Sequence, residues 1–251
     1  MPLLRPFTRL LSFVAALVFF AALPACSPPP PAGAAAAGCQ GSIIPVPPEL
    51  TAALAVYRAG GPKGWAFTQT TSGPKLNLVE RFDPRVRGTD RWTLLSKDGA
   101  TPSEDDYRSY RETSAAKTDS DNASSVRDQL NLATCTLAAS DEGTSTYHFA
   151  LHPSSKKDTA AEHMRAAFTL DRSTGVIVRV ELFTFEPLSP VLSLKIDEAS
   201  TVMSYTLPAD GRPSLLSEIS MKLRGRRLWV RPFAEDMTIR YTDQVNASVD
   251  K

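Results

Sequence analysis

The sequence has few cysteines, few glycines and almost no excess of charge. Only 3 of its 251 residues are cysteine, so it is not a small scaffold held together by disulfides. With 13 Gly it is no collagen, and 42% hydrophobic residues argue against a disordered chain. Its 28 basic and 27 acidic residues leave a net charge of +1, and this balance gives no electrostatic sign of nucleic-acid binding. The length allows one large domain or two small ones.

The sequence also lacks the short motifs that accompany common catalytic sites. It contains no Gly-x-Ser-x-Gly, no His-Glu-x-x-His, no glycine-rich phosphate loop and no Cys-x-x-Cys. His148 and His152 are four residues apart on an expected strand, so they lie on one face, but no third metal ligand accompanies them. We therefore expect a protein that is not an enzyme and that has no catalytic residue, no cofactor and no metal.

Residues 1–25 have the pattern of a secretory signal peptide. Arg5 and Arg9 precede the apolar stretch Leu10–Leu23, which is shorter than the about 20 residues of a membrane-spanning helix. The next residues, Leu23-Pro24-Ala25-Cys26, resemble a bacterial lipobox, in which the cysteine becomes the acylated N-terminus of a lipoprotein and carries groups such as palmitate. The alternatives are ordinary cleavage after Ala25 and retention of the segment as a membrane anchor.

Ser27 follows the lipobox cysteine, a choice typical of lipoproteins that are sent to the outer membrane and face the periplasm. Residues 26–47 are rich in Pro and Ala, and such a tether can extend up to roughly 60 Å at about 3.1 Å per residue. If Cys26 carries lipid, Cys39 and Cys135 remain as a possible disulfide in an oxidising compartment.

Residues 48–245 have the pattern of one folded domain, followed by a short tail at 246–251. A helix is expected over Pro48–Tyr57, and a second helix begins at Ser103 with acidic residues in its first turn. We expect residues 113–127, which are rich in Ser, Ala and Asp, to form a mobile loop.

Most of the remaining domain alternates between apolar and polar residues, which predicts about ten or eleven antiparallel strands with one apolar face. Turn residues at Asp171–Gly175 and Pro208–Gly211 predict hairpins. The expected fold is mainly β (α+β): a curved antiparallel sheet that forms an incomplete β-barrel with a few covering helices.

Three segments carry a resemblance to a known family: Glu80–Pro84, Arg91–Gly99 followed by Pro102, and Glu186–Ile196. They resemble a proteobacterial branch of the LolA/LolB-like lipoprotein-carrier superfamily, and the resemblance extends over residues 48–245 in the order of the elements. It implies an incomplete antiparallel barrel closed by helices, with an apolar cavity that holds acyl chains. An anchor at Cys26 matches the outer-membrane receptor of that superfamily rather than its soluble carrier.

The candidate ligand site consists of apolar residues on the inward face of the expected strands. We expect Val178, Val180 and Leu182 to lie opposite Ile219, Met221 and Leu223 across the concave sheet. The residues expected to line the cavity are Trp65, Phe67, Trp92, Phe168, Val178, Val180, Leu182, Met221 and Leu223.

Two functions remain open from the sequence. The first is an outer-membrane-tethered lipoprotein that binds a lipid or acylated ligand, with a role in lipoprotein or lipid trafficking. The second is a structural or interaction scaffold with a filled barrel and an envelope protein as partner.

A basic run surrounds Leu228 and Trp229 near the C-terminus. It consists of Lys222, Arg224, Arg226, Arg227 and Arg231. One interpretation is a contact with anionic lipid headgroups, and the other is an ordinary outward strand face with a tight turn at Gly225.

Overall fold

The computed structural model describes residues 42–60, 63–118, 126–153, 158–228 and 230–247, and it confirms a mainly β fold. Eleven strands are present in this part of the chain. They are β1 (Trp65–Gly73), β2 (Leu76–Phe82), β3 (Trp92–Lys97), β4 (Leu130–Ser140), β5 (Thr144–Leu151), β6 (Met164–Asp171), β7 (Ile177–Thr184), β8 (Leu188–Val191), β9 (Leu194–Tyr205), β10 (Leu216–Arg227) and β11 (Arg231–Asn246).

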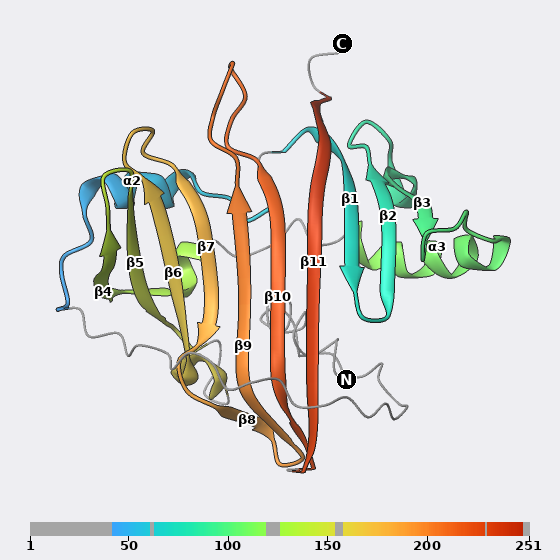
Figure 1. Ribbon diagram of the computed structural model, residues 1–251. Coiled ribbons are helices and arrows are strands. Elements are labelled where there is room, and N and C mark those ends of the chain that lie inside the picture. The colour runs from blue at the N-terminus through green and yellow to red at the C-terminus, as the bar shows by residue number, and fades with distance from the viewer. Residues whose placement is uncertain (1–41, 61–62, 119–125, 154–157, 229, 248–251) are drawn as a thin grey trace, which may run out of the picture.

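All of these strands belong to one antiparallel sheet. Its order is β3-β2-β1-β11-β10-β9-β7-β6-β5-β4, and β8 pairs with β9 off this path. The sheet is curved, and its end strands β3 and β4 are far apart, so it is not closed (Figure 1).

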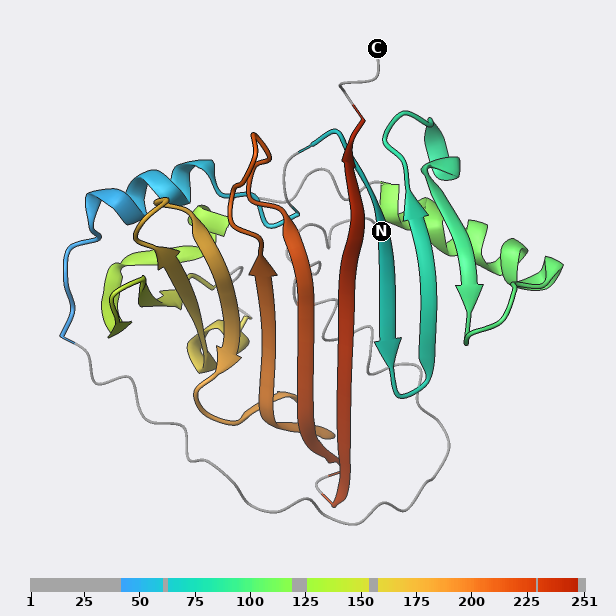
Figure 2. The same cartoon turned by 45° about the horizontal axis from the view of Figure 1, so that its top comes forward.

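Two main helices lie on the same side of the sheet. Helix α2 (Pro48–Val56) lies behind the upper ends of β5–β7, and α3 (Glu104–Thr118) lies behind β1–β3 (Figure 2). Three short elements complete the described chain, namely η1 (Gly88–Arg91), α4 (Val126–Gln129) and η3 (Ala160–His163). We call the helix-bearing side the inner face.

Within the described residues, no helix has both the length and the apolar composition that crossing a membrane requires.

The predicted hairpin between β6 and β7 is confirmed, and its turn shows why the sequence forms it. The Asp171 carboxylate accepts hydrogen bonds from the backbone N–H groups of Ser173 (3.1 Å) and Thr174 (2.8 Å). Gly175 has a φ of 68°, which glycine adopts without steric cost. The turn pairs Phe168 with Val180.

The predicted alternation fails at the start of β7. Thr169 pairs with Arg179 but Leu170 pairs with Ile177, so Val178 is the extra residue of a β-bulge. Ile177 is therefore buried in the core and Val178 is only half-buried, although the sequence pattern placed Val178 inward and Ile177 outward.

Helix α3 begins where the sequence predicts, but it is longer. The Ser103 hydroxyl accepts a hydrogen bond from the Asp106 backbone N–H (3.2 Å), and the Asp106 carboxylate accepts one from the Ser103 N–H (3.0 Å). This reciprocal pair is a capping box. The helix continues to Thr118, and α4 begins at Val126. The expectation of a loop over all of 113–127 was therefore wrong for both ends of that range, because the backbone there is helical.

A small second core packs at the lower end of the sheet. Leu188, Leu194 and Ile196 are buried there with Leu223, and Phe233 packs against them. Gly225 of β10 lies opposite a bulge of β9 at Asp197, and a Cβ atom there would lie 2.3 Å from the Lys195 carbonyl oxygen and 2.9 Å from the Phe233 ring. Only glycine fits this close approach without movement of the backbone.

Candidate functional site

The inner face of the sheet consists of rows of side chains that run across neighbouring strands. One row joins Phe168, Val180, Met203, Ile219 and Ile239 through direct pairing of β6, β7, β9, β10 and β11. The next row joins Ala166, Leu182, Thr201, Met221 and Met237 in the same way. We call the second one, together with Met164 on β6, the methionine row.

This arrangement corrects one expectation about the site. Val180 and Leu182 do not face Ile219 and Met221 across a concavity, because β9 alone separates β7 from β10. The four side chains are neighbours on one continuous wall rather than opposite walls of a cavity.

Helix α2 covers the part of the first row on β6, β7 and β9 and fills the space above it. Leu50 and Leu54 of α2 are buried with Phe168 and Met203, and Val180 beneath them is only 1% exposed. Two of the predicted cavity residues, Phe168 and Val180, therefore lie in a closed hydrophobic core.

A pair of tyrosines fixes the end of α2 to the sheet. The Tyr57 hydroxyl lies 2.6 Å from the Tyr205 hydroxyl, which in turn donates to the Ala59 carbonyl oxygen (3.0 Å). Burial raises the pKa of Tyr57 to about 12, and burial with the neighbouring Tyr57 also raises the pKa of Tyr205. Both hydroxyl groups stay protonated at neutral pH and act as hydrogen-bonding groups.

The methionine row is half-buried except at Ala166, which is fully buried. Its other members line a groove with a free volume of about 30 Å³, together with Ala199 and Leu223 and with the polar residues Ser200, Lys222 and Glu235. Three of the predicted residues, Leu182, Met221 and Leu223, lie here. The row also contains Met164 and Met237, which were not among the predicted site residues. The alternation could have indicated them, because they lie on the same strand faces as Phe168 and Ile239.

An aromatic cluster lies at the other end of the inner face. Phe67 of β1 stacks on Phe82 of β2 with a centroid distance of 5.0 Å, and it contacts Trp92 (5.8 Å) and Tyr241 (5.3 Å) edge-on. Burial raises the pKa of Tyr241. Phe67 and Trp92 were predicted site residues, whereas Phe82 and Tyr241 were not.

A buried carboxylate lies next to this cluster, under α3. Glu80 of β2 is 1% exposed and accepts a hydrogen bond from the Gln69 side-chain amide (3.0 Å). Tyr110 is buried on α3 beside Glu80, and burial and the nearby carboxylate both raise its pKa. Apart from its place on the inward phase of a strand, nothing in the sequence pointed to Glu80.

The other two predicted cavity residues lie apart from these groups. Trp65 is half-buried at the start of β1, with the Arg212 guanidinium 5.7 Å from the centre of its ring. Val178 is the bulged residue of β7. The nine predicted residues are thus distributed over the core under α2, the groove, the aromatic cluster and these two separate positions.

A wider hollow lies on the opposite, outer face of β5–β7. Its volume is about 390 Å³, and its lining is Thr146, His148, Ala167, Thr169, Arg179, Glu181 and Phe183. Burial lowers the pKa of His148, and Glu181 pairs with Arg179 at 3.1 Å. Among the described residues, no group of three His, Cys, Asp or Glu side chains is placed to hold a metal.

Of the three cysteines predicted to be modified, Cys135 alone lies within the described residues. Cys26 and Cys39 are outside the described residues, so lipidation and the disulfide stay predictions. Cys135 is buried in β4, and burial raises the pKa of its thiol. Ile44, five residues after Cys39, donates its backbone N–H to the Cys135 carbonyl oxygen (2.9 Å), so the chain approaches β4 beside this thiol.

Comparison of the chain with protein-family models, with curated proteins and with solved structures gave no match in any of the three.

Proposed function

We propose that this protein is a non-enzymatic lipoprotein of the outer membrane, facing the periplasm, that binds a lipid or acyl chain on the inner face of an incomplete barrel. The observation that carries the proposal is the methionine row. It is largely apolar and half-buried, and it lies between the core that α2 covers and the small second core at the lower end of the sheet. A LolA/LolB-like role in lipid or lipoprotein trafficking agrees with this arrangement.

The row has the length and the chemistry that an acyl chain needs. It crosses five strands, and four spacings of about 4.8 Å span about 19 Å. The acyl chains of one membrane leaflet span about 15 Å. Each methylene group that leaves water contributes about 0.8 kcal/mol.

The present groove is smaller than a lipid, so binding requires that its walls move. The groove volume of about 30 Å³ is far below about 300 Å³, which is the lower end of the usual volume range of ligand pockets. Methionine side chains are unbranched and change rotamer easily, and Met164, Met221 and Met237 are all half-exposed. We propose that an acyl chain displaces these three side chains.

The proposal is tested with a fluorescent fatty acid and the variant Met221→Trp. The wild type should bind the fatty acid, and the variant should bind it at least about tenfold more weakly because the indole occupies the groove. Thermal unfolding should change little, since Met221 is half-exposed.

Val202→Trp is the matched control. Val202 is half-buried on the outer face of β9, next to Thr201 of the row, so it should keep wild-type binding. Failure of the wild type to bind, or an equal loss in Val202→Trp, contradicts the proposal. Val180→Trp is less informative here because the side chain at 180 is already enclosed in the filled core.

The second candidate function is a scaffold in the cell envelope with a filled interior. The small volume of the groove and the closed core under α2 favour it. If the wild type binds no fatty acid, the scaffold function is favoured over lipid binding.

A further inference from the structure

The lower end of the sheet combines two turns that are far apart in the sequence. The first joins β8 to β9, and the second joins β10 to β11 (Figure 1). The Leu228 backbone N–H donates to the Ser193 carbonyl oxygen at 2.7 Å, and Arg227 pairs with Leu194. We call residues 190–195, 226–228 and 230–231 the tip.

The tip exposes aliphatic side chains to solvent. Four residues contribute: Val191 (56% exposed), Leu192 (90%), Leu228 (61%) and Val230 (76%). Scattered exposed apolar residues need no explanation, but a group of four on two adjoining turns is typical of an interaction surface.

The backbone at Leu228 is unusual for its residue type. Its φ is +49°, and the other non-glycine residues with positive φ in the described chain are all aspartates. Aspartate tolerates this left-handed region, whereas leucine is disfavoured there. Strain at an exposed residue indicates that the side chain serves something other than the stability of the fold.

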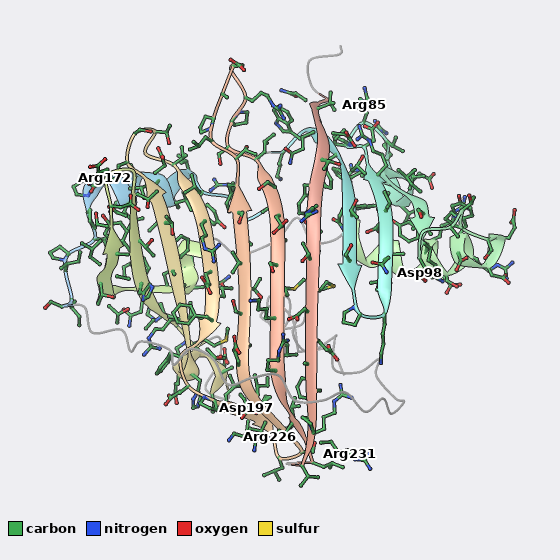
Figure 3. All side chains as sticks on the ribbon, in the orientation of Figure 1. Arg85, Asp98, Arg172, Asp197, Arg226 and Arg231 are labelled. Carbon is green, nitrogen blue, oxygen red and sulfur yellow. The ribbon has the colours of Figure 1, made fainter. Side chains whose placement is uncertain are left out.

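The tip is also basic. Lys195, Arg226, Arg227 and Arg231 belong to it, and residues 190–195 and 226–231 contain no acidic residue. Figure 3 shows Arg226 and Arg231 at this end of the molecule. Two carboxylates from just beyond the tip form ion pairs with it: Asp197 with Arg226 (3.3 Å) and Lys195 (3.6 Å), and Glu235 with Arg227 (3.7 Å). Four cations and two carboxylates leave a surplus of two positive charges.

We propose that the tip inserts its four aliphatic side chains into a bilayer of anionic phospholipid. An apolar end surrounded by cations matches such a surface, since the aliphatic groups leave water while the arginines reach the headgroups. A bilayer can also receive the two turns without a pocket that is complementary to their shape. The contact does not depend on a ligand in the groove or on lipid at Cys26. It would orient the molecule so that strands β9–β11 point with their lower ends at the membrane.

A fluorescent probe at the tip tests this contact in the full chain. Leu192→Cys is labelled with an environment-sensitive fluorophore and mixed with vesicles of equal parts phosphatidylglycerol and phosphatidylcholine that carry nitroxide-labelled lipid. The labelled wild type is measured in parallel to subtract any signal from Cys39 and Cys135. We expect quenching and a blue shift, and both should weaken in vesicles of phosphatidylcholine alone or in high salt.

Two further variants separate insertion from unfolding and from attachment elsewhere. Leu207→Cys places the same probe on an exposed leucine in the connection between β9 and β10, at the opposite end of these strands, where we expect no quenching. Leu228→Asn in the Leu192→Cys background should lower the ratio of inserted to free tips about tenfold without lowering the melting temperature, because Asn tolerates positive φ. No quenching at position 192, or equal quenching at 207, overturns the proposal.

Discussion

Helices α2 and α3 lie on the same face of one sheet but are held there by different means. The N-cap residue of α2, Pro47, offers no capping hydrogen bond from its side chain, and the helix buries Leu50, Ala53 and Leu54 against the strands. Helix α3 has the Ser103–Asp106 capping box and an ion pair from Lys97 to Asp106. Tyr110 is the one buried side chain of α3 among those that the structure describes up to Glu112.

The difference predicts how tightly each helix is coupled to the sheet. Removal of α2 would expose Phe168 and Val180, so its position is coupled to global stability. Up to Glu112, α3 is attached through polar groups at its first turn and through Tyr110, so we expect it to open more readily than α2.

The largest predicted effect tests the role of α2. Leu50→Ala should lower the free energy of unfolding by about 2–5 kcal/mol, because Leu50 is fully buried and the truncation leaves a cavity. Val56→Ala, on the exposed side of the same helix, should change it by less than about 0.5 kcal/mol. Urea unfolding measures both, and equal effects would show that α2 is not a core element.

An alkaline transition of intermediate size should also involve α2. Folding raises the pKa of Tyr57 from 10.0 to about 12, so the folded state retains a proton that the unfolded state releases between these values. The contribution of Tyr57 to the free energy of unfolding is fully present below pH 10. It is lost as the pH rises to about 12, which lowers the free energy of unfolding by about 2–3 kcal/mol.

Urea unfolding across this pH range gives the measurement. Tyr57→Phe should lose less stability than the wild type on going from pH 10 to 12. A wild type and a variant with parallel pH profiles would argue against the contribution of Tyr57.

The smallest predicted effect tests the attachment of α3. Ser103→Ala should destabilise the helix by about 1 kcal/mol because it removes the cap of the first turn. Hydrogen exchange should then accelerate at the α3 amides and stay unchanged in β9–β11. Thr101→Ala, an exposed change just before the helix, is the control. Faster exchange across the whole sheet would mean that α3 is as tightly coupled to the core as α2.

The sequence predicted most of the fold because one face of each strand is buried. Alternation along β6 and the turn at Asp171 were sufficient to predict the β6–β7 hairpin, and eleven strands agree with the predicted ten or eleven. The bulge at Val178 was not predictable, since a run of Val176, Ile177 and Val178 fits either phase and only the pairing with β6 decides it.

The candidate site was less predictable for a related reason. Alternation tells which side chains face inward, but it does not tell what covers them. Val180 and Met221 have the same inward phase, yet the first is closed by α2 and the second lies in the open groove. The buried Glu80 illustrates the opposite problem, because a carboxylate on an inward phase looks like an interruption of the pattern unless the helix above it is known.

The glycine at position 225 has a consequence for the history of this fold. The Lys195 carbonyl and the Phe233 ring leave no space for any side chain there, whereas most surface positions of the strands accept many residues. A homologous chain that keeps this bulge and this ring must keep the glycine even after its other residues have diverged. In chains that share this fold, we therefore expect glycine at the position of Gly225 wherever an aromatic ring occupies the paired position of Phe233.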